Sequence, residues 1–158
     1  MKNISLNTCK YKMRFIPLLY QLTTKIFEMK NVFPTAELNG VLVANHSSEH
    51  TFIFDNGIKL GGVSKEQCTR LCATQSESIV QDCGGYKIVA TTFKLTNEVV
   101  ASFHEAIECV GENGLVLVSR VHRNAINENL GIDALPQVVC GITIDRVTKI
   151  VSSTKFSH

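Results

Sequence analysis

Hydrophobic and polar positions form short blocks along the chain, and the first blocks predict strands. The apolar run at 41–44 predicts a strand. The apolar runs at 52–54 and 58–60 flank Asp55-Asn56-Gly57, and Asn-Gly between two apolar runs predicts a β-hairpin. Residues 64–75 fit a short helix or a strand equally well, so this part of the pattern leaves both open.

The next blocks predict a strand and then a helix. Residues 86–93 alternate and are rich in β-branched side chains, which is typical of a strand. Thr96 can cap a helix over about 97–110, and Gly111 can end it. Its apolar stripe consists of Val99, Phe103, Ile107 and Val110.

The last third of the chain repeats this alternation. Residues 115–118 predict a short buried strand, and Ser119 can cap a second helix over about 120–130. The runs 138–144 and 147–151 predict a closing hairpin around Asp145-Arg146. Together the blocks predict a single α+β domain with a mostly antiparallel sheet, hairpins and two short helices.

Charge divides the chain into two parts. Residues 1–30 carry six basic side chains against Glu28, a net charge of +5, while residues 31–158 carry 10 basic and 13 acidic side chains, a net charge of −3. This division predicts a basic N-terminal extension over 1–30 and an α+β domain over 31–158. The mildly acidic domain is a poor match for a nucleic-acid backbone. No apolar run reaches the roughly 18 residues of a membrane helix, so we expect neither nucleic acid nor membrane as a partner.

The first thirty residues also resemble a signal peptide in part. Basic residues precede the apolar stretch 15–20, but this stretch is short and no small-residue cleavage site follows before Lys25. Met13 and Met29 are alternative starting points for the chain. We therefore interpret the segment as an extension or a loosely attached helix.

The stretch His46-Ser47-Ser48-Glu49-His50 reads H-x-x-E-H, the zinc motif of inverted zinc proteases. That motif needs a helix, which brings both histidines to one metal ion. Here both flanks predict strands, and in an extended segment the two histidines lie ~13 Å apart. We therefore expect a polar loop between strands and no metal site.

The six cysteines form no C-x-x-C pair, although Cys68 and Cys72 would share one face of a helix. We expect them to be reduced and mostly buried. The sequence also contains no P-loop, no G-x-S-x-G and no dinucleotide fingerprint. We therefore assign no catalytic residue and no cofactor.

One junction has the chemistry of an anion site. The segment 118–123 runs from a strand into a helix, where Ser119 adds a hydroxyl and Arg120 and Arg123 add two guanidinium groups beside the helix N-terminus. The alternative is an ordinary capped helix with solvated arginines. His50 and Thr92 are candidates for additional ligand contacts.

From about residue 38 onward the chain resembles a family of small uncharacterised bacteriophage proteins. The resemblance is carried by Ser48-Glu49-His50, where the family pattern has Thr-Pro-His, and by three further segments: 86–93, 115–120 and 142–145. It implies phage origin and action in the host bacterial cytoplasm, and it supplies no activity.

We therefore expect a non-enzymatic phage accessory protein that binds a phosphorylated small molecule, a nucleotide signal or a host protein. The alternatives are a small enzyme acting on a nucleotide or peptide, and a phage structural or assembly protein. Any of these could form a homo-oligomer.

Overall fold

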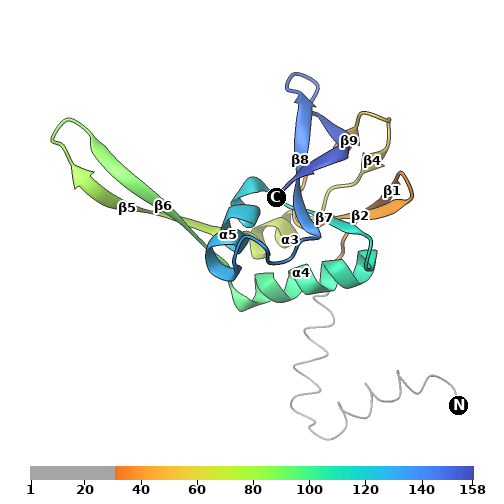
Figure 1. The fold of residues 1–158 in the computed structure, drawn as a ribbon, viewed down its shortest axis with the longest axis horizontal. Coiled ribbons are helices and arrows are strands. Elements are labelled where there is room, and N and C mark those ends of the chain that lie inside the picture. The colour runs from red at the N-terminus through yellow and green to blue at the C-terminus, as the bar shows by residue number, and fades with distance from the viewer. Residues whose placement is uncertain (1–30) are drawn as a thin grey trace, which may run out of the picture. The chain divides into compact units, whose positions relative to one another are not determined.

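The computed structural model describes residues 31–158, and Phe33–His158 form one compact unit. The predicted extension over 1–30 lies outside the described residues. The unit combines a seven-stranded sheet, a separate two-stranded hairpin and three helices (Figure 1). The predicted α+β class is therefore compatible with the fold.

The large sheet is mixed, with strand order β1-β2-β7-β8-β9-β3-β4. Pairs β2–β7, β7–β8 and β3–β9 are parallel, while β1–β2, β3–β4 and β8–β9 are antiparallel. The prediction of a mostly antiparallel sheet was therefore too simple, because local hairpin signals say nothing about pairing between distant strands. The strands are β1 (Thr35–Leu38), β2 (Val41–Asn45), β3 (Phe52–Phe54), β4 (Lys59–Leu60), β7 (Leu115–Leu117), β8 (Val138–Asp145) and β9 (Ile150–Ser157).

The helices begin where side-chain caps are available. Helix α4 (Asn97–Val110) starts after Thr96, and α5 (Arg120–Leu130) starts after Ser119, as predicted. A third helix, α3 (Lys65–Arg70), starts after Ser64 and adds to the two that were predicted. The ambiguous stretch 64–75 thus begins with a short helix and ends in the first residues of a strand, Thr74–Asp82.

Two cores lie on opposite faces of the central strands. Along β2, Val43 packs into one core and its neighbour Ala44 into the other, and Val116 and Leu117 of β7 divide in the same way. Successive side chains of a strand point to opposite faces, so a strand covered on both sides must be apolar throughout. This explains the continuous apolar runs. The first core also contains the buried α4 residues Val99, Phe103, Ala106 and Val110.

The sheet curls like a barrel, so that its edge strands β1 and β4 come into contact. Asn45, at the end of β2, donates a hydrogen bond from Nδ2 to the Gly61 carbonyl at 2.8 Å. The closure brings the loop after β2 close to the chain that follows β4.

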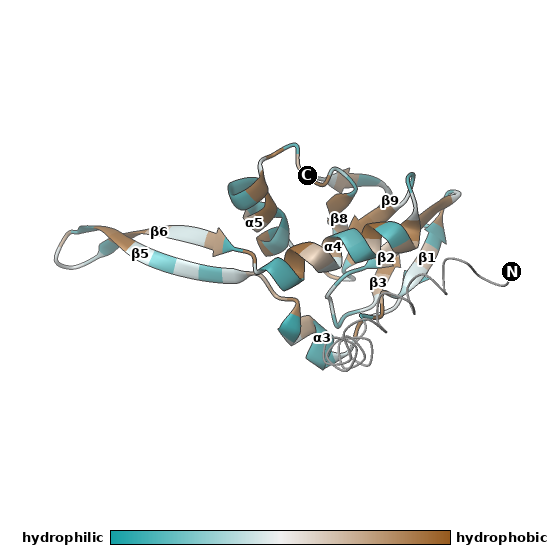
Figure 2. Cartoon of the chain, turned by 90° about the horizontal axis from the view of Figure 1, so that it is seen from below, coloured by the Kyte–Doolittle hydropathy of each residue, from teal (hydrophilic) through white to brown (hydrophobic). Residues whose placement is uncertain are grey.

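The strands β5 (Thr74–Asp82) and β6 (Lys87–Lys94) form a hairpin that extends away from the rest of the unit (Figure 1). Nearly all of its residues are exposed. Figure 2 shows hydrophilic and hydrophobic residues along it, with an apolar stretch toward the tip. The exposed apolar residues there are Ile79, Val80, Tyr86, Ile88 and Val89.

A buried polar cluster joins the loop after β2 to the helices. The His46 ring is fully buried, stacks on Phe33 and contacts Phe103 and His122. Ser102 Oγ donates to the Val99 carbonyl, so it must accept from His46 Nε2–H at 2.7 Å. Nε2 therefore carries a proton, and Nδ1 is buried without a hydrogen-bond partner.

Burial of His46 predicts that stability depends on pH. Burial is the larger cause and the nearby His122 is the smaller one, and together they lower the pKa of His46 from 6.5 to about 3. The unfolded chain therefore takes up a proton below pH 6.5 while the folded chain does not, so stability is full above pH 6.5 and falls toward pH 3. We expect His46 to account for a loss of roughly 2 kcal/mol in unfolding free energy between pH 7.5 and 5.0.

Urea unfolding at the two pH values measures this loss. His46→Gln keeps an N–H donor for Ser102 but cannot titrate, so its pH dependence should be clearly smaller. His104→Gln changes an exposed histidine on α4 and serves as the control. Equal pH dependence in His46→Gln and the unmodified chain would contradict the assignment.

Candidate functional site

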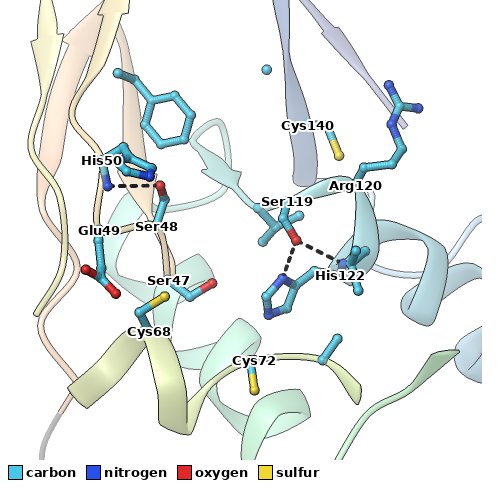
Figure 3. A pocket seen from close by; sticks show the side chains of 15 residues that line it. Ser47, Ser48, Glu49, His50, Cys68, Cys72, Ser119, Arg120, His122 and Cys140 are labelled. Atoms are coloured by element: carbon cyan, nitrogen blue, oxygen red, sulfur yellow. Dashed lines mark hydrogen bonds between the residues drawn. The ribbon is translucent and has the colours of Figure 1, made fainter. Parts of the chain in front are cut away.

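A cavity of about 640 Å³ opens beyond the carboxyl ends of the parallel strands β2 and β7, beside the first half of β8. Such a volume is typical of small-molecule pockets, and in α/β sheets the carboxyl ends of parallel strands are a common place for them. Figure 3 shows the loop after β2 facing the junction between β7 and α5 across this cavity. The polar and sulfur-bearing side chains on its wall are Ser47, Ser48, Glu49, His50, Cys68, Cys72, Ser119, Arg120, His122 and Cys140.

The loop 46–50 is fixed by backbone contacts. Asn45 Nδ2 donates to the Ser48 carbonyl and Asn45 Oδ1 accepts from the Ser48 N–H, at 2.8 and 3.0 Å. The Val63 N–H also donates to the Ser48 carbonyl at 2.8 Å. A Cβ atom placed on Gly62 would lie 1.9 Å from the Glu49 carbonyl oxygen, so only glycine allows this approach. Glu49 and His50 are thereby held at the cavity wall.

On the opposite wall, Ser119 follows β7 and caps α5. Its Oγ accepts a hydrogen bond from the His122 backbone N–H at 3.2 Å and lies 2.7 Å from His122 Nδ1 (Figure 3). His122 Nε2 lies 2.6 Å from the Leu71 carbonyl, which can only accept. Nε2 therefore carries the proton, Nδ1 carries a lone pair, and the Ser119 hydroxyl donates to it.

Burial keeps this imidazole neutral. His122 is 5% exposed, and desolvation lowers its pKa, while the hydrogen bond to the Leu71 carbonyl acts in the opposite direction. Ser119, by contrast, is exposed. The junction thus places an exposed serine on the cavity wall beside the mostly buried imidazole that accepts its proton.

Charge is distributed unequally around the cavity. Burial raises the pKa of the Cys140 thiol, and the nearby positive charge of Arg120 acts in the opposite direction. Arg120 and Cys140 lie on the same side of the cavity (Figure 3). On the other side, Glu49 adds to the effect of burial in raising the pKa of Cys68. The cavity therefore has a basic side at Arg120 and an acidic side at Glu49.

The structure brings together three of the five site residues predicted from the sequence. Ser119, Arg120 and His50 all line the cavity. Thr92 does not, because it lies on the β6 strand of the hairpin with its Oγ1 2.8 Å from Ser76 Oγ. Arg123 is also outside the cavity lining, on the buried side of α5.

Arg123 has a structural role that differs both from the predicted anion contact and from the alternative of a solvated arginine. It is 1% exposed, and all five of its N–H groups donate to the protein. Nε binds Asn127 Oδ1, and the other four N–H groups bind three carbonyls of the loop between α5 and β8 and the carbonyl of the first β8 residue. These carbonyls belong to Ile132, Ala134, Leu135 and Val138, at 2.8–3.0 Å.

The two histidines of the H-x-x-E-H stretch have separate environments. His46 is in the buried cluster, while His50 is exposed and lines the cavity. The predicted loop between strands is confirmed, since no helix forms between β2 and β3. Within residues 31–158, no group of three or more metal-binding side chains gathers. No helix in this range is long and apolar enough to cross a membrane.

Within residues 31–158 the cysteines are free, but the expectation that they are mostly buried was wrong. Of the five cysteines in the described range, Cys140 is buried, Cys68 and Cys83 are half-buried, and Cys72 and Cys109 are exposed. Cys68, Cys72 and Cys140 line the cavity.

Sequence reasoning missed His122 and Glu49. The spacing Ser119-x-x-His122 is that of a capping box, in which the third residue after the cap reaches back toward the cap. This spacing could have indicated the serine–histidine contact. Nothing local indicated that the Leu71 carbonyl, 51 residues away, accepts from the other ring nitrogen.

The close approach at Gly62 predicts that Gly62→Ala distorts the cavity. The added methyl group cannot fit against the Glu49 carbonyl, so the loop 46–50 must move, at a cost of about 1–3 kcal/mol in unfolding free energy. Gly61→Ala is the matched control, because its Cβ atom would meet only Pro34 Cβ at 3.6 Å. Urea unfolding of both variants measures the difference, and equal stability would contradict the packing argument.

The two arginines at the start of α5 should behave oppositely. Arg123→Ala leaves four carbonyls of the 132–138 loop without their donor, so we expect a loss of about 3–5 kcal/mol in unfolding free energy. Arg120→Ala changes an exposed side chain and should cost less than about 0.5 kcal/mol. Urea titration measures both. A small loss for Arg123→Ala would show that the loop holds without the guanidinium.

No family model matches the chain, and no curated protein or solved structure matches it.

Proposed function

We propose that the chain binds a small molecule carrying one anionic group, and that it does so as a phage-encoded accessory protein in the bacterial cytoplasm. The observation that carries the binding proposal is the exposed Arg120, placed beside the hydroxyl of Ser119 on the wall of a cavity of about 640 Å³. Phage origin and location rest on the sequence resemblance alone.

The start of α5 favours an anion at this wall. Backbone N–H groups at a helix N-terminus carry a partial positive charge, and an adjacent guanidinium adds a full one. Arg120 is free of the structural task that occupies Arg123, so it is the guanidinium that a ligand can reach. His50, on the facing loop, adds an imidazole to the same cavity (Figure 3).

The far wall limits how much negative charge a ligand can carry. Glu49 lies on that wall close to Cys68, and a carboxylate repels a second anionic group. Apolar contacts are available from Phe52, Val118, Val121 and Ala73. The cavity therefore suits a ligand with a neutral or apolar body and one phosphate or carboxylate at the Arg120 end.

Calorimetry with three probes tests this proposal. AMP and phenyl phosphate each carry one phosphate on a neutral body, while adenosine has the body without the anion. We expect the two phosphates to bind and adenosine to bind at least about tenfold more weakly, since a charge-assisted hydrogen bond contributes about 1.5–3 kcal/mol. Arg120→Ala should weaken binding of the phosphates about tenfold to a hundredfold.

Arg146→Ala removes the same charge from an exposed residue that does not line the cavity, so it serves as the control. It should bind both phosphates as the unmodified chain does. Unchanged phosphate binding in Arg120→Ala, or no binding to the unmodified chain, would contradict the proposed site. Binding of a host protein would then be the better proposal.

A further inference from the structure

We propose that Ser119 is a nucleophile activated by His122, and that the cavity cleaves a carboxylic ester whose acyl part carries an anionic group. The proposal rests on the proposed function in one respect, since Arg120 is the group that would hold the anionic end. The nucleophile itself rests on a separate observation, the hydrogen-bond chain from Ser119 through His122 to the Leu71 carbonyl.

These hydrogen bonds connect a hydroxyl, an imidazole and a carbonyl in the order that a serine nucleophile requires. The serine hydroxyl lies 2.7 Å from one imidazole nitrogen, and the other nitrogen is held at 2.6 Å by an acceptor. Because the Leu71 carbonyl fixes the proton on Nε2, the lone pair of Nδ1 points to the Ser119 hydroxyl. This is the arrangement of nucleophile, general base and orienting group that activates hydroxyl groups in enzymes.

The surroundings suit the base and the nucleophile differently. His122 packs against the rings of His46 and Phe103, so its orientation is fixed and most of the residue is removed from water, while a small part of it lines the cavity. Ser119 is exposed on the cavity wall, where a substrate can reach it. A neutral buried base beside an accessible hydroxyl in a cavity is a candidate catalytic pair.

Capping alone does not account for the contact with the imidazole. Ser64 and Thr96 cap α3 and α4 by accepting one backbone N–H at 3.2 Å, the same distance at which Ser119 accepts the His122 N–H. At these two caps the third residue of the helix is Gln67 or Val99, and no imidazole is present. Ser119 makes the capping bond and, in addition, donates its own proton to a histidine.

The charge balance favours acyl transfer over phosphoryl transfer. Phosphoryl transfer spreads charge over several oxygens, and proteins stabilise it with metal ions and several cationic side chains. Here Arg120 is the arginine on the cavity wall, and Glu49 lies across from it. An acyl substrate develops a single oxyanion, which the backbone N–H groups at the start of α5 can stabilise.

The reaction proceeds in two steps. Ser119 Oγ attacks the ester carbonyl carbon while its proton moves to His122 Nδ1; the C–O bond to the alcohol then breaks, and the alcohol leaves with that proton. The product is an acyl-serine. Water then attacks the acyl carbon, gives a proton to His122 Nδ1, and releases the acid as Ser119 recovers its proton.

Labelling of the folded chain with an alkyl fluorophosphonate tests the nucleophile directly. Attack by Ser119 Oγ forms an oxygen–phosphorus bond and expels fluoride, so each chain gains one phosphonyl group. Intact mass followed by peptide mapping should find this group on Ser119 and not on Ser64, the exposed capping serine without a histidine. No adduct, or equal labelling of the two serines, would overturn the proposal.

Variants then separate activation from accessibility. Ser119→Ala should abolish labelling and Ser64→Ala should leave it unchanged. His122→Gln, which keeps an N–H donor for the Leu71 carbonyl, should slow labelling about 100-fold. Should His122→Gln fail to fold, the comparison of Ser119 with Ser64 in the unmodified chain still decides the outcome.

Two esters of equal acyl length test the substrate class. The mono-4-nitrophenyl ester of succinic acid carries a carboxylate, and 4-nitrophenyl butanoate does not. Release of nitrophenolate should favour the succinate, and Arg120→Ala should remove that preference. Labelling of Ser119 without phosphate binding would overturn the anion site and leave the nucleophile standing, while phosphate binding without labelling would do the reverse.

Discussion

The arrangement of the cavity depends on the two hydrogen bonds of the His122 ring. One bond holds the end of α3 through the Leu71 carbonyl, and the other holds the first residue before α5 through the Ser119 hydroxyl. A buried ring with two partners can satisfy both only in one protonation state and one orientation. The same ring therefore fixes two distant segments in space and determines which way the Ser119 proton points.

Further buried polar pairs next to the His122 ring stabilise its position. The His46 carbonyl accepts from Gln67 Nε2 at 3.0 Å, which joins α3 to the loop after β2. The His46 ring binds Ser102 of α4 and contacts His122. Each of these groups would be costly to bury alone, and each becomes acceptable because its partner is buried beside it. The cost that is not offset is the bare Nδ1 of His46.

Arg123 performs the same task for the loop that returns the chain to β8. Its carbonyl partners include that of Leu135, whose φ of 49° lies in the left-handed region that side chains other than glycine rarely adopt. A guanidinium presents its five donors in one plane, so it can hold several carbonyls of one loop at once. Of the two arginines at the start of α5, Arg123 therefore stabilises the fold and Arg120 remains at the cavity.

The local elements follow from the sequence because their causes are local. The hairpin at Asn56-Gly57, the caps at Thr96 and Ser119 and the apolar stripe of α4 all act within a few residues. The sequence also placed Ser119 and Arg120 at a strand-to-helix junction, which the structure places on the cavity wall. These features need no knowledge of the rest of the fold.

What only the tertiary structure decided depends on partners far away in the chain. The parallel pairing of β2 with β7 joins residues about seventy positions apart, and the His122–Leu71 bond spans 51 residues. The different fates of Arg120 and Arg123 also arise this way, because the same side chain is solvated or buried according to the loop that folds over it. The local pattern predicted the same anion contact for both arginines. It could not separate them, because the carbonyls that bind Arg123 come close to it only when β8 joins the sheet.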